Sequence, residues 1–297
     1  MDSPAITIGL PIALAILMFG LGLSLTVEDF RRTARQPLAV GVALVVQVVL
    51  LPAVCLGLVL VLGLDPVLGL GMVLLAASPG GTSANLLSHL FRGDVALNIT
   101  LTAINSVLAV LTLPLVVNLA VAVLAPPTTG AVALTFDKTV QVFAIVLVPV
   151  ALGMVVRRLA PGFADRADRP VRILSAVMLA AVVVGAIAGN LGTLGEYLAQ
   201  AGLAAALFCA ISLATGYLLP RLLRVGHRQA IASSFEIGLH NGTLAITIAV
   251  SLLGDERLAI PAAVYGVLAF PMALVAGFLF VRTGAARSSA ESSTSAA

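Results

Sequence analysis

One acidic residue of this sequence is surrounded by apolar residues. Glu236 lies in the stretch SSFEIGLHNGT (residues 233–243), inside an apolar run that covers 230–253. An ionisable side chain in such a run is costly to bury and is a candidate functional group by default. His240, Asn241 and two glycines accompany it, so we expect a helix break where freed carbonyls and Glu236 coordinate a cation. The alternative is a polar cluster that only holds helices together.

A second polar interruption, SPGGTSAN (residues 78–85), occurs in the other half of the chain. Pro79 removes a backbone donor and clashes with the preceding helical turn, and Gly80 and Gly81 follow it. A simple kink or a close helix contact is the alternative explanation. Two interrupted apolar runs, one in each half of the chain, are typical of the ion and substrate site of a secondary transporter.

Further polar residues lie near these interruptions. Asn98, Thr102 and Asn105 share one face of a predicted helix, and Gln47 is alone in the middle of another apolar run. Each could be an interhelical hydrogen bond or a cation ligand. Their oxygen atoms suit a hard cation such as Na⁺, whereas the grouped His or Cys ligands that a transition metal prefers are absent from the sequence.

Composition then identifies the class of protein that must position these groups. The chain has 297 residues, of which 60% are hydrophobic and 10% are charged, whereas a soluble domain carries about 25% charged residues. This excludes a soluble enzyme, and the continuous apolar runs exclude the alternating strands of a membrane barrel. The net charge of +3 does not indicate a nucleic-acid partner, because the basic residues lie in short loops. The sequence predicts an all-α polytopic membrane protein.

Nine apolar runs are long enough to cross the hydrocarbon core as helices. They cover residues 4–26, 38–63, 67–91, 95–124, 139–157, 172–190, 198–219, 230–253 and 259–281. If the N-terminus is outside, every Lys and Arg residue except Lys138 and Arg257 falls on the inner side, as the positive-inside rule requires. We therefore expect an inner (plasma) membrane protein with a cytoplasmic C-terminus, and a disordered cytoplasmic tail over 287–297.

Three stretches together resemble the bile acid:sodium symporter (BASS) family. They are MFGLGL (18–23) with EDFR (28–31), SPGGTSAN (78–85) with RGDVAL (92–97), and EIGLHN (236–241). The resemblance runs from about Leu14 to Arg282, and it is to nine-span bacterial relatives of the apical and hepatic bile acid transporters. It implies an inverted-repeat fold in which the broken spans three and eight cross. The implied panel domain comprises 4–26 and 139–190, and the implied core domain comprises 38–124 and 198–281.

The same resemblance implies particular site residues. The first sodium site would use Ala84, Asn85, Asn98, Thr102 and Glu236, and the second would use Gln47, Glu236, Ile237, Leu239 and His240. From the residues themselves we expect helix breaks at Pro79, Gly80, Gly81 and Gly238. The half-helix N-termini favour an anion, for which the candidate donors are Thr82, Ser83, Asn241 and Gly242. His240 departs from the family pattern, because imidazole offers nitrogen rather than oxygen and can titrate near neutral pH. The second site would then be weaker, pH-dependent or partly replaced by proton coupling.

The sequence thus predicts a sodium-coupled symporter of an organic anion that works by alternating access. The anion would be bile-acid-like or a smaller carboxylate or sulfonate, and it and the lipid bilayer are the only partners expected. Na⁺ is the coupling ion, and no organic cofactor, nucleic acid or obligatory protein partner is expected. The alternative is a proton-coupled organic-anion carrier that uses Glu236 and His240. An intramembrane enzyme or a channel is a further alternative.

Overall fold

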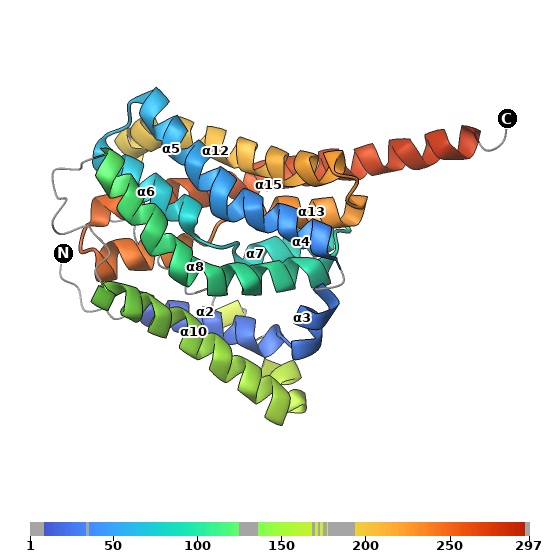
Figure 1. Ribbon diagram of the computed structural model, residues 1–297, viewed down its shortest axis with the longest axis horizontal. Coiled ribbons are helices and arrows are strands. Elements are labelled where there is room, and N and C mark those ends of the chain that lie inside the picture. The colour runs from blue at the N-terminus through green and yellow to red at the C-terminus, as the bar shows by residue number, and fades with distance from the viewer. Residues whose placement is uncertain are drawn as a thin grey trace.

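All the regular secondary structure that the structure describes is helical. A computed structural model describes residues 9–33, 36–124, 136–167 and 194–294, together with 170, 171, 173, 174 and 177. Most helices run side by side along one common direction, with α2 and α10 together at one edge of the bundle (Figure 1). The predicted all-helical class is therefore confirmed for the described part of the chain.

The first half of the chain contains α2 (Gly9–Ser24), α3 (Val27–Thr33), α4 (Pro37–Val45), the π-helical turn η1 (Val46–Leu50), α5 (Leu51–Leu62), α6 (Pro66–Ala77), α7 (Thr82–Leu90) and α8 (Val95–Leu124). The second half contains α10 (Phe136–Leu159), α12 (Leu194–Leu222), α13 (His227–Gly238), α14 (Gly242–Thr247), the π-helical turn η2 (Ile248–Leu252), the 3₁₀ turn η3 (Glu256–Ala259) and α15 (Ile260–Thr294).

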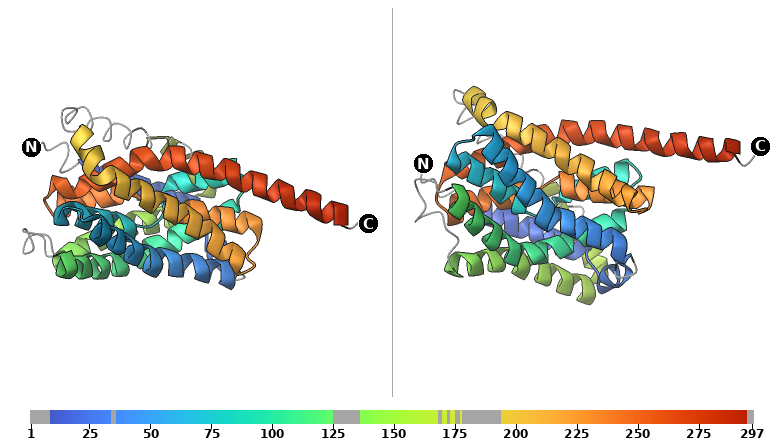
Figure 2. Two further views of the ribbon diagram at one scale, coloured as in Figure 1. Left: turned by 90° about the horizontal axis from the view of Figure 1, so that it is seen from above. Right: turned by 45° about the horizontal axis from the view of Figure 1, so that its top comes forward.

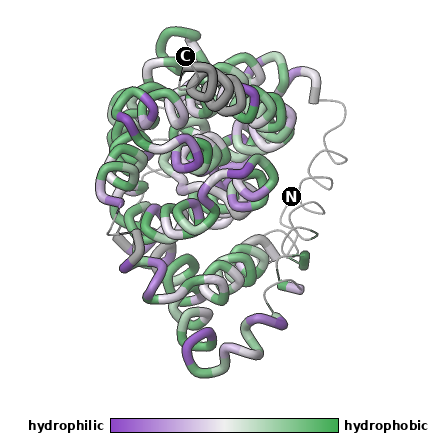
Figure 3. The backbone as a smooth tube through the Cα atoms, turned by 90° about the vertical axis from the view of Figure 1, so that its right-hand side faces the viewer, coloured by the Kyte–Doolittle hydropathy of each residue, from purple (hydrophilic) through white to green (hydrophobic). Residues whose placement is uncertain are grey.

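Several helices have the length and the apolar surface of membrane spans. Within the described residues, four segments are long and apolar enough to cross a bilayer: Pro37–Leu62, Val95–Leu124, Gly195–Leu222 and Glu256–Thr283. Apolar residues cover most of the helical turns in Figure 3. The chain is therefore a helical membrane protein. Most of the predicted span 172–190, and the first residues of the span 4–26, lie outside the described residues.

The C-terminal helix differs from the expectation for the tail. We expected disorder from Arg287 onward, but α15 continues to Thr294, and it extends well beyond the rest of the bundle (Figure 2). An existing helix grows by one hydrogen bond per added residue without a new nucleation step. A Ser- and Ala-rich segment can therefore continue a helix that it would not start by itself. The last three residues of the predicted disordered tail, 295–297, lie outside the part of the chain that the structure describes.

Helices α2 and α10 approach each other closely because two glycines meet at their contact. A Cβ atom added to Gly22 would lie 2.2 Å from Val150 O and 2.9 Å from Gly153 Cα. A Cβ atom added to Gly153 would lie 2.4 Å from Phe19 O. Any larger side chain at either glycine would force the two helices apart, so these positions fix α2 and α10 as one packed pair.

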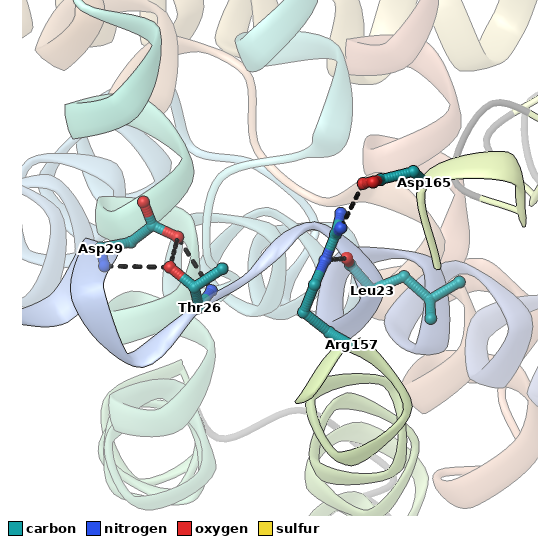
Figure 4. A network of polar contacts seen from close by, with 5 residues as sticks. All are labelled: Leu23, Thr26, Asp29, Arg157 and Asp165. Atoms are coloured by element: carbon teal, nitrogen blue, oxygen red, sulfur yellow. Dashed lines mark hydrogen bonds and ion pairs between the residues drawn. The ribbon is translucent and has the colours of Figure 1, made fainter. Parts of the chain in front are cut away.

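Polar contacts hold the end of this pair. Arg157 of α10 donates a hydrogen bond from Nε to Leu23 O of α2 and forms an ion pair with Asp165 (Figure 4). Beside them, the N–H and the hydroxyl of Thr26 donate to the Asp29 carboxylate at 2.8 and 2.6 Å, at the start of α3. These contacts tie the last turn of α2 to α10 and begin the short helix that leads toward α4.

Candidate functional site

The first helix break follows from proline chemistry. Pro79 restricts the preceding residue to extended backbone, and Ser78 accordingly has φ −73° and ψ 148°, which ends α6 at Ala77. Gly81 is also extended, with φ −88° and ψ 161°, and it caps the start of α7. The interruption predicted from SPGGTSAN thus separates two half-helices, with residues 78–81 between them.

The second break contains no proline and is closed by an asparagine. Helix α13 ends at Gly238, and α14 begins after Asn241, whose side-chain Oδ1 accepts a hydrogen bond of 3.0 Å from Leu244 N. The Asn241 N–H, which an unbroken helix would direct to Ile237 O, donates instead to Pro79 O at 2.8 Å. Glu236 therefore lies in the last turn of α13, two residues before the helix ends, rather than in the break itself.

The two breaks satisfy each other's backbone groups. Gly81 N–H donates to Leu239 O at 2.6 Å, and Asn241 N–H donates to Pro79 O at 2.8 Å, so that Gly80 and His240 form an isolated antiparallel bridge. All of these residues are buried. Backbone groups in an apolar interior need partners, and here each interrupted helix supplies the partners of the other. The crossing of the two half-helix pairs is therefore a single unit.

Glu236 projects from α13 into this crossing. Its side chain is completely buried, and Thr102 donates from Oγ1 to Glu236 Oε2 at 2.5 Å while Asn105 donates from Nδ2 to Oε1 at 3.2 Å. The carboxylate lies against the first break, because a Cβ atom added to Gly80 would be 2.3 Å from Glu236 Cδ. Among the described residues, no cationic side chain pairs with this carboxylate.

Three amide oxygens of the same region lack hydrogen-bond donors. The Oδ1 atoms of Asn85, Asn98 and Asn105 are buried and have no donor in the described structure. Asn98 is held in place through its other amide atom, since Nδ2 donates to Ala232 O at 2.7 Å, one turn before Glu236. Buried polar atoms without a partner are rare in folded proteins. A carboxylate with several amide oxygens is the donor set that a hard cation prefers.

Gln47 and His240 contact each other on the other side of the first break. Gln47 lies in the π-helical turn η1. Pro52 follows this turn and has no N–H to donate to Val48 O, so the regular α-helical hydrogen-bond pattern is interrupted there. Its Nε2 atom donates to Ser78 O at 2.9 Å and lies 3.3 Å from His240 Nδ1. This contact connects η1 to both helix breaks.

The His240 ring is held by aromatic neighbours. It stacks on Phe208 with ring centroids 5.1 Å apart and lies edge-on to Tyr265 at 5.6 Å. Its Nδ1 atom is 3.4 Å from Ser78 O, and its Nε2 atom is buried without a partner. Tyr265 also donates from its hydroxyl to Gly238 O at 2.8 Å, which satisfies a carbonyl near the end of α13.

The residues expected to meet a substrate are at or beside the breaks. Ser83 is half-buried at the start of α7, whereas the side chain of Thr82 lies outside the described part. Asn241 uses its side-chain oxygen to cap α14. Gly242 N–H donates to His240 O at 2.9 Å, so this donor is occupied in the present conformation.

Comparison with known proteins identifies the family. The model of the sodium bile acid symporter family matches residues 11–197, which is more than half of the chain. The chain belongs to this family. The sodium-dependent transporter YocS of Bacillus subtilis, described as uncharacterized, is 28% identical over 260 residues, which cover 86% of this chain and 78% of that protein. The family consists of sodium-dependent transporters, so this member is a transporter and not an enzyme.

Two eukaryotic members of the family differ more from this chain than YocS does, the rice protein in its length and the human protein in its sequence. The probable chloroplastic sodium/metabolite cotransporter BASS2 of Oryza sativa is 29% identical over 259 residues, covering 85% of this chain and 59% of the rice protein. The human ileal sodium/bile acid cotransporter is 23% identical over 240 residues, covering 80% of this chain and 68% of the human protein. The chain thus spans less than two thirds of the length of the rice protein.

The structure also adds residues to the set expected for this family member. Asn105 was on the predicted polar face but not among the predicted ligands, although it contacts Glu236 directly. Its spacing of seven residues from Asn98 was the signal in the sequence. Tyr265 was not expected near the breaks, because nothing local indicates its bond to Gly238 O. Ala84 is fully buried in α7, and only its backbone could serve a cation.

Proposed function

We propose that this protein is a sodium-coupled symporter of an organic anion, with the coupling Na⁺ bound where the two broken helices cross. The observation that carries the proposal is the buried Glu236 carboxylate, which has no cationic partner in the described residues and lies in a region with three donor-less amide oxygens. A buried charge needs compensation, and Na⁺ would supply it with the oxygen ligands that a hard cation prefers.

The first predicted sodium site agrees best with this geometry. Glu236, Asn85, Asn98 and Thr102 would provide side-chain oxygens, and the backbone carbonyl of Ala84 would take the place of a side chain. We add Asn105 to this set, because it orients the Glu236 carboxylate and carries a donor-less oxygen of its own. The region draws on α7, α8 and α13, so a bound cation would connect both halves of the chain.

The anion would bind beside the sodium-loaded crossing. Helix α7 begins there, and the N-terminus of a helix favours an anionic group. Thr82, Ser83, Asn241 and Gly242 remain our candidate contacts, with the Gly242 N–H becoming available only if its turn to His240 O opens. The relatives are described as transporters of bile acid or of metabolites, and we propose a carboxylate or sulfonate of that range. Coupling then means that the anion binds well only after Na⁺.

Two matching turns, one in each half of the chain, support the proposal of an inverted repeat and of transport by alternating access. The turns after α5 and α12 have the same hydrogen bond. Gly63 N–H donates to Leu60 O in the first turn, and Arg224 N–H donates to Arg221 O in the second. Gly63 and Arg224 both have a positive φ, at 62° and 64°. Each turn leads into a helix that then breaks. We propose nine spans in an inverted repeat, in which the core (38–124 and 198–281) moves against a panel (4–26 and 139–190). The close α2–α10 pair would belong to the panel.

The proposed orientation places the N-terminus outside and the C-terminus in the cytoplasm, because this arrangement puts almost all Lys and Arg residues inside. Any net positive charge that moved inward in a transport cycle would gain about 2.3 kcal/mol from a membrane potential of 100 mV, whereas an electroneutral cycle would gain nothing.

Uptake by reconstituted vesicles tests the proposal. The purified protein would be reconstituted into liposomes and supplied with radiolabelled pyruvate, pantoate, isethionate and taurocholate in turn. An inward Na⁺ gradient should drive accumulation of at least one of these probes, and an equal K⁺ gradient should not. Accumulation that follows a pH gradient and is unchanged when K⁺ replaces Na⁺ would instead establish the proton-coupled alternative.

A further inference from the structure

The polar groups at the helix crossing form two sets with different chemistry. On α7 and α8, the amide oxygens of Asn85, Asn98 and Asn105 have no donor, and Asn105 contacts Glu236 directly. The side-chain atoms that contact Ser78 O are both nitrogens, Gln47 Nε2 at 2.9 Å and His240 Nδ1 at 3.4 Å, and the donor-less Oε1 atom of Gln47 is not the amide atom bonded to Ser78 O. A hard cation prefers the oxygen atoms of the first set and is repelled by the N–H group that Gln47 directs at Ser78 O in the second.

We infer that this symporter binds a single Na⁺ at the crossing, because His240 closes the second cation position that the family resemblance implies. The inference rests on the proposed function, since it concerns the number of coupling ions and not their existence. Three observations support it, and each concerns a different group of the expected second site.

The first observation is that Gln47 turns a donor toward the shared carbonyl. Its Nε2 atom bonds Ser78 O, so the amide nitrogen and not the amide oxygen faces the position between Gln47 and His240. Reversing the amide would place two oxygens against each other. Gln47 also lines a cavity of about 10 Å³ with Pro79 and Asn105. A space of this size admits about one water molecule, which could satisfy Gln47 Oε1.

The second observation is that one of the two backbone carbonyls of the expected site is engaged. Leu239 O accepts the 2.6 Å hydrogen bond from Gly81 N–H that holds the crossing together. The other expected backbone ligand is Ile237 O. It lacks its usual helical donor, because Asn241 N–H bonds to Pro79 O instead. Hard cations in proteins typically take about six oxygen ligands, and Ile237 O, Gln47 Oε1 and the Glu236 carboxylate fall short of that number.

The third observation is that the imidazole is fixed in place. His240 is 7% exposed and is stacked on Phe208 with an angle of 17° between the rings, and Tyr265 covers it edge-on. A flexible glutamine at this position could present an oxygen, whereas the ring presents only nitrogen. Because Phe208 and Tyr265 hold the plane of the ring, the ring presents nitrogen or carbon to Ser78 O in either flipped orientation, and never oxygen.

A single coupling ion has a consequence for transport. One Na⁺ that moves with one monovalent anion carries no net charge across the membrane. Uptake would therefore depend on the Na⁺ gradient but not on the membrane potential, whereas a second Na⁺ would make uptake increase at inside-negative potential.

Equilibrium binding of radioactive Na⁺ to the purified full-length protein tests the inference. The ionic strength is kept constant with KCl while the Na⁺ concentration is varied. We expect about one Na⁺ per chain and a Hill coefficient of about one for the wild type. His240→Gln, which restores an amide oxygen, should bind about two Na⁺ per chain. His89→Gln makes the same chemical change at an exposed histidine of α7 and should behave as the wild type.

The outcomes separate this inference from the proposed function. Two Na⁺ bound to the wild-type protein would overturn the inference and leave the symport proposal intact. One Na⁺ bound to a folded His240→Gln variant would also overturn it, because His240 would then not be the cause. No specific Na⁺ binding to the wild type would overturn the proposed function and this inference together. The wild-type count decides the matter even if the variant does not fold.

Discussion

Two adjacent glycines in the first helix break should respond very differently to the same substitution. A Cβ atom on Gly80 would lie 2.3, 2.4 and 2.5 Å from Cδ, Oε1 and Oε2 of Glu236, whereas a Cβ atom on Gly81 would meet its nearest neighbour, Leu239 O, at 3.3 Å. Ordinary contacts of a Cβ atom begin at 3.4 Å, so Gly80→Ala requires the carboxylate to withdraw by about 1 Å. Gly81→Ala requires only a slight adjustment.

The expected effect of Gly80→Ala is a loss of Na⁺ affinity together with a moderate loss of stability. Overpacking of this kind costs about 1–3 kcal/mol, and disturbance of a ligand's surroundings typically reduces metal affinity about 10- to 100-fold. At an Na⁺ concentration of 100 times the wild-type Kd, Na⁺ should add about 2.7 kcal/mol to the free energy of unfolding. After a 100-fold loss of affinity this addition falls to about 0.4 kcal/mol.

The assay is thermal unfolding in detergent, with NaCl replaced by KCl at constant ionic strength. Gly81→Ala is the matched control and should keep most of the Na⁺-dependent rise in the unfolding temperature. The reasoning is refuted if Gly80→Ala keeps the wild-type response to Na⁺, or if both variants lose it equally. Either result would mean that the position of the Glu236 carboxylate against the first break does not determine cation binding.

Three further variants test other parts of the structure. Thr102→Val removes the hydroxyl that donates to Glu236 and should weaken Na⁺ binding at least about tenfold, whereas Thr102→Ser should restore it in the same titration. Gly153→Leu forces a side chain into the contact with Gly22 and should lower the unfolding temperature in the absence of Na⁺ by several degrees, with no specific effect on Na⁺ affinity. Arg224→Gly removes a non-glycine residue from left-handed backbone at φ 64° and should raise the free energy of unfolding by about 1 kcal/mol, which chemical or thermal denaturation can measure.

The first helix break could be predicted because its cause is local. Pro79 removes a donor and restricts Ser78, and both effects follow from the sequence alone. The apolar runs were equally visible, and the run 95–124 has the bounds of α8. The end of α13 was harder to place, because Leu239 O and Asn241 N–H bond to Gly81 and Pro79 of the opposite break. A long-range pairing of this kind has no signature in local propensity.

The candidate site could be predicted in its components but not in its connections. The polar face of α8 indicated which side chains share a side, but the contact between Asn105 and Glu236 depends on how α8 packs on α13. In the same way, the chemistry of His240 was evident as a departure from the family pattern. Its stacking on Phe208 joins the second helix break to α12, and only the structure shows that the ring is held there.

The most direct test of the central claim is whether Na⁺ stabilises the folded protein through Glu236. Thermal unfolding would be measured in NaCl and in KCl at about pH 6 and about pH 8, a range that spans the ordinary titration of histidine. The variants are Glu236→Gln and, as a control, Glu196→Gln at an exposed acid of α12. The account predicts an Na⁺-specific rise in the unfolding temperature at both pH values for the wild type and the control, and its loss in Glu236→Gln. An unchanged rise in Glu236→Gln, or no difference between NaCl and KCl in the wild type, would contradict it.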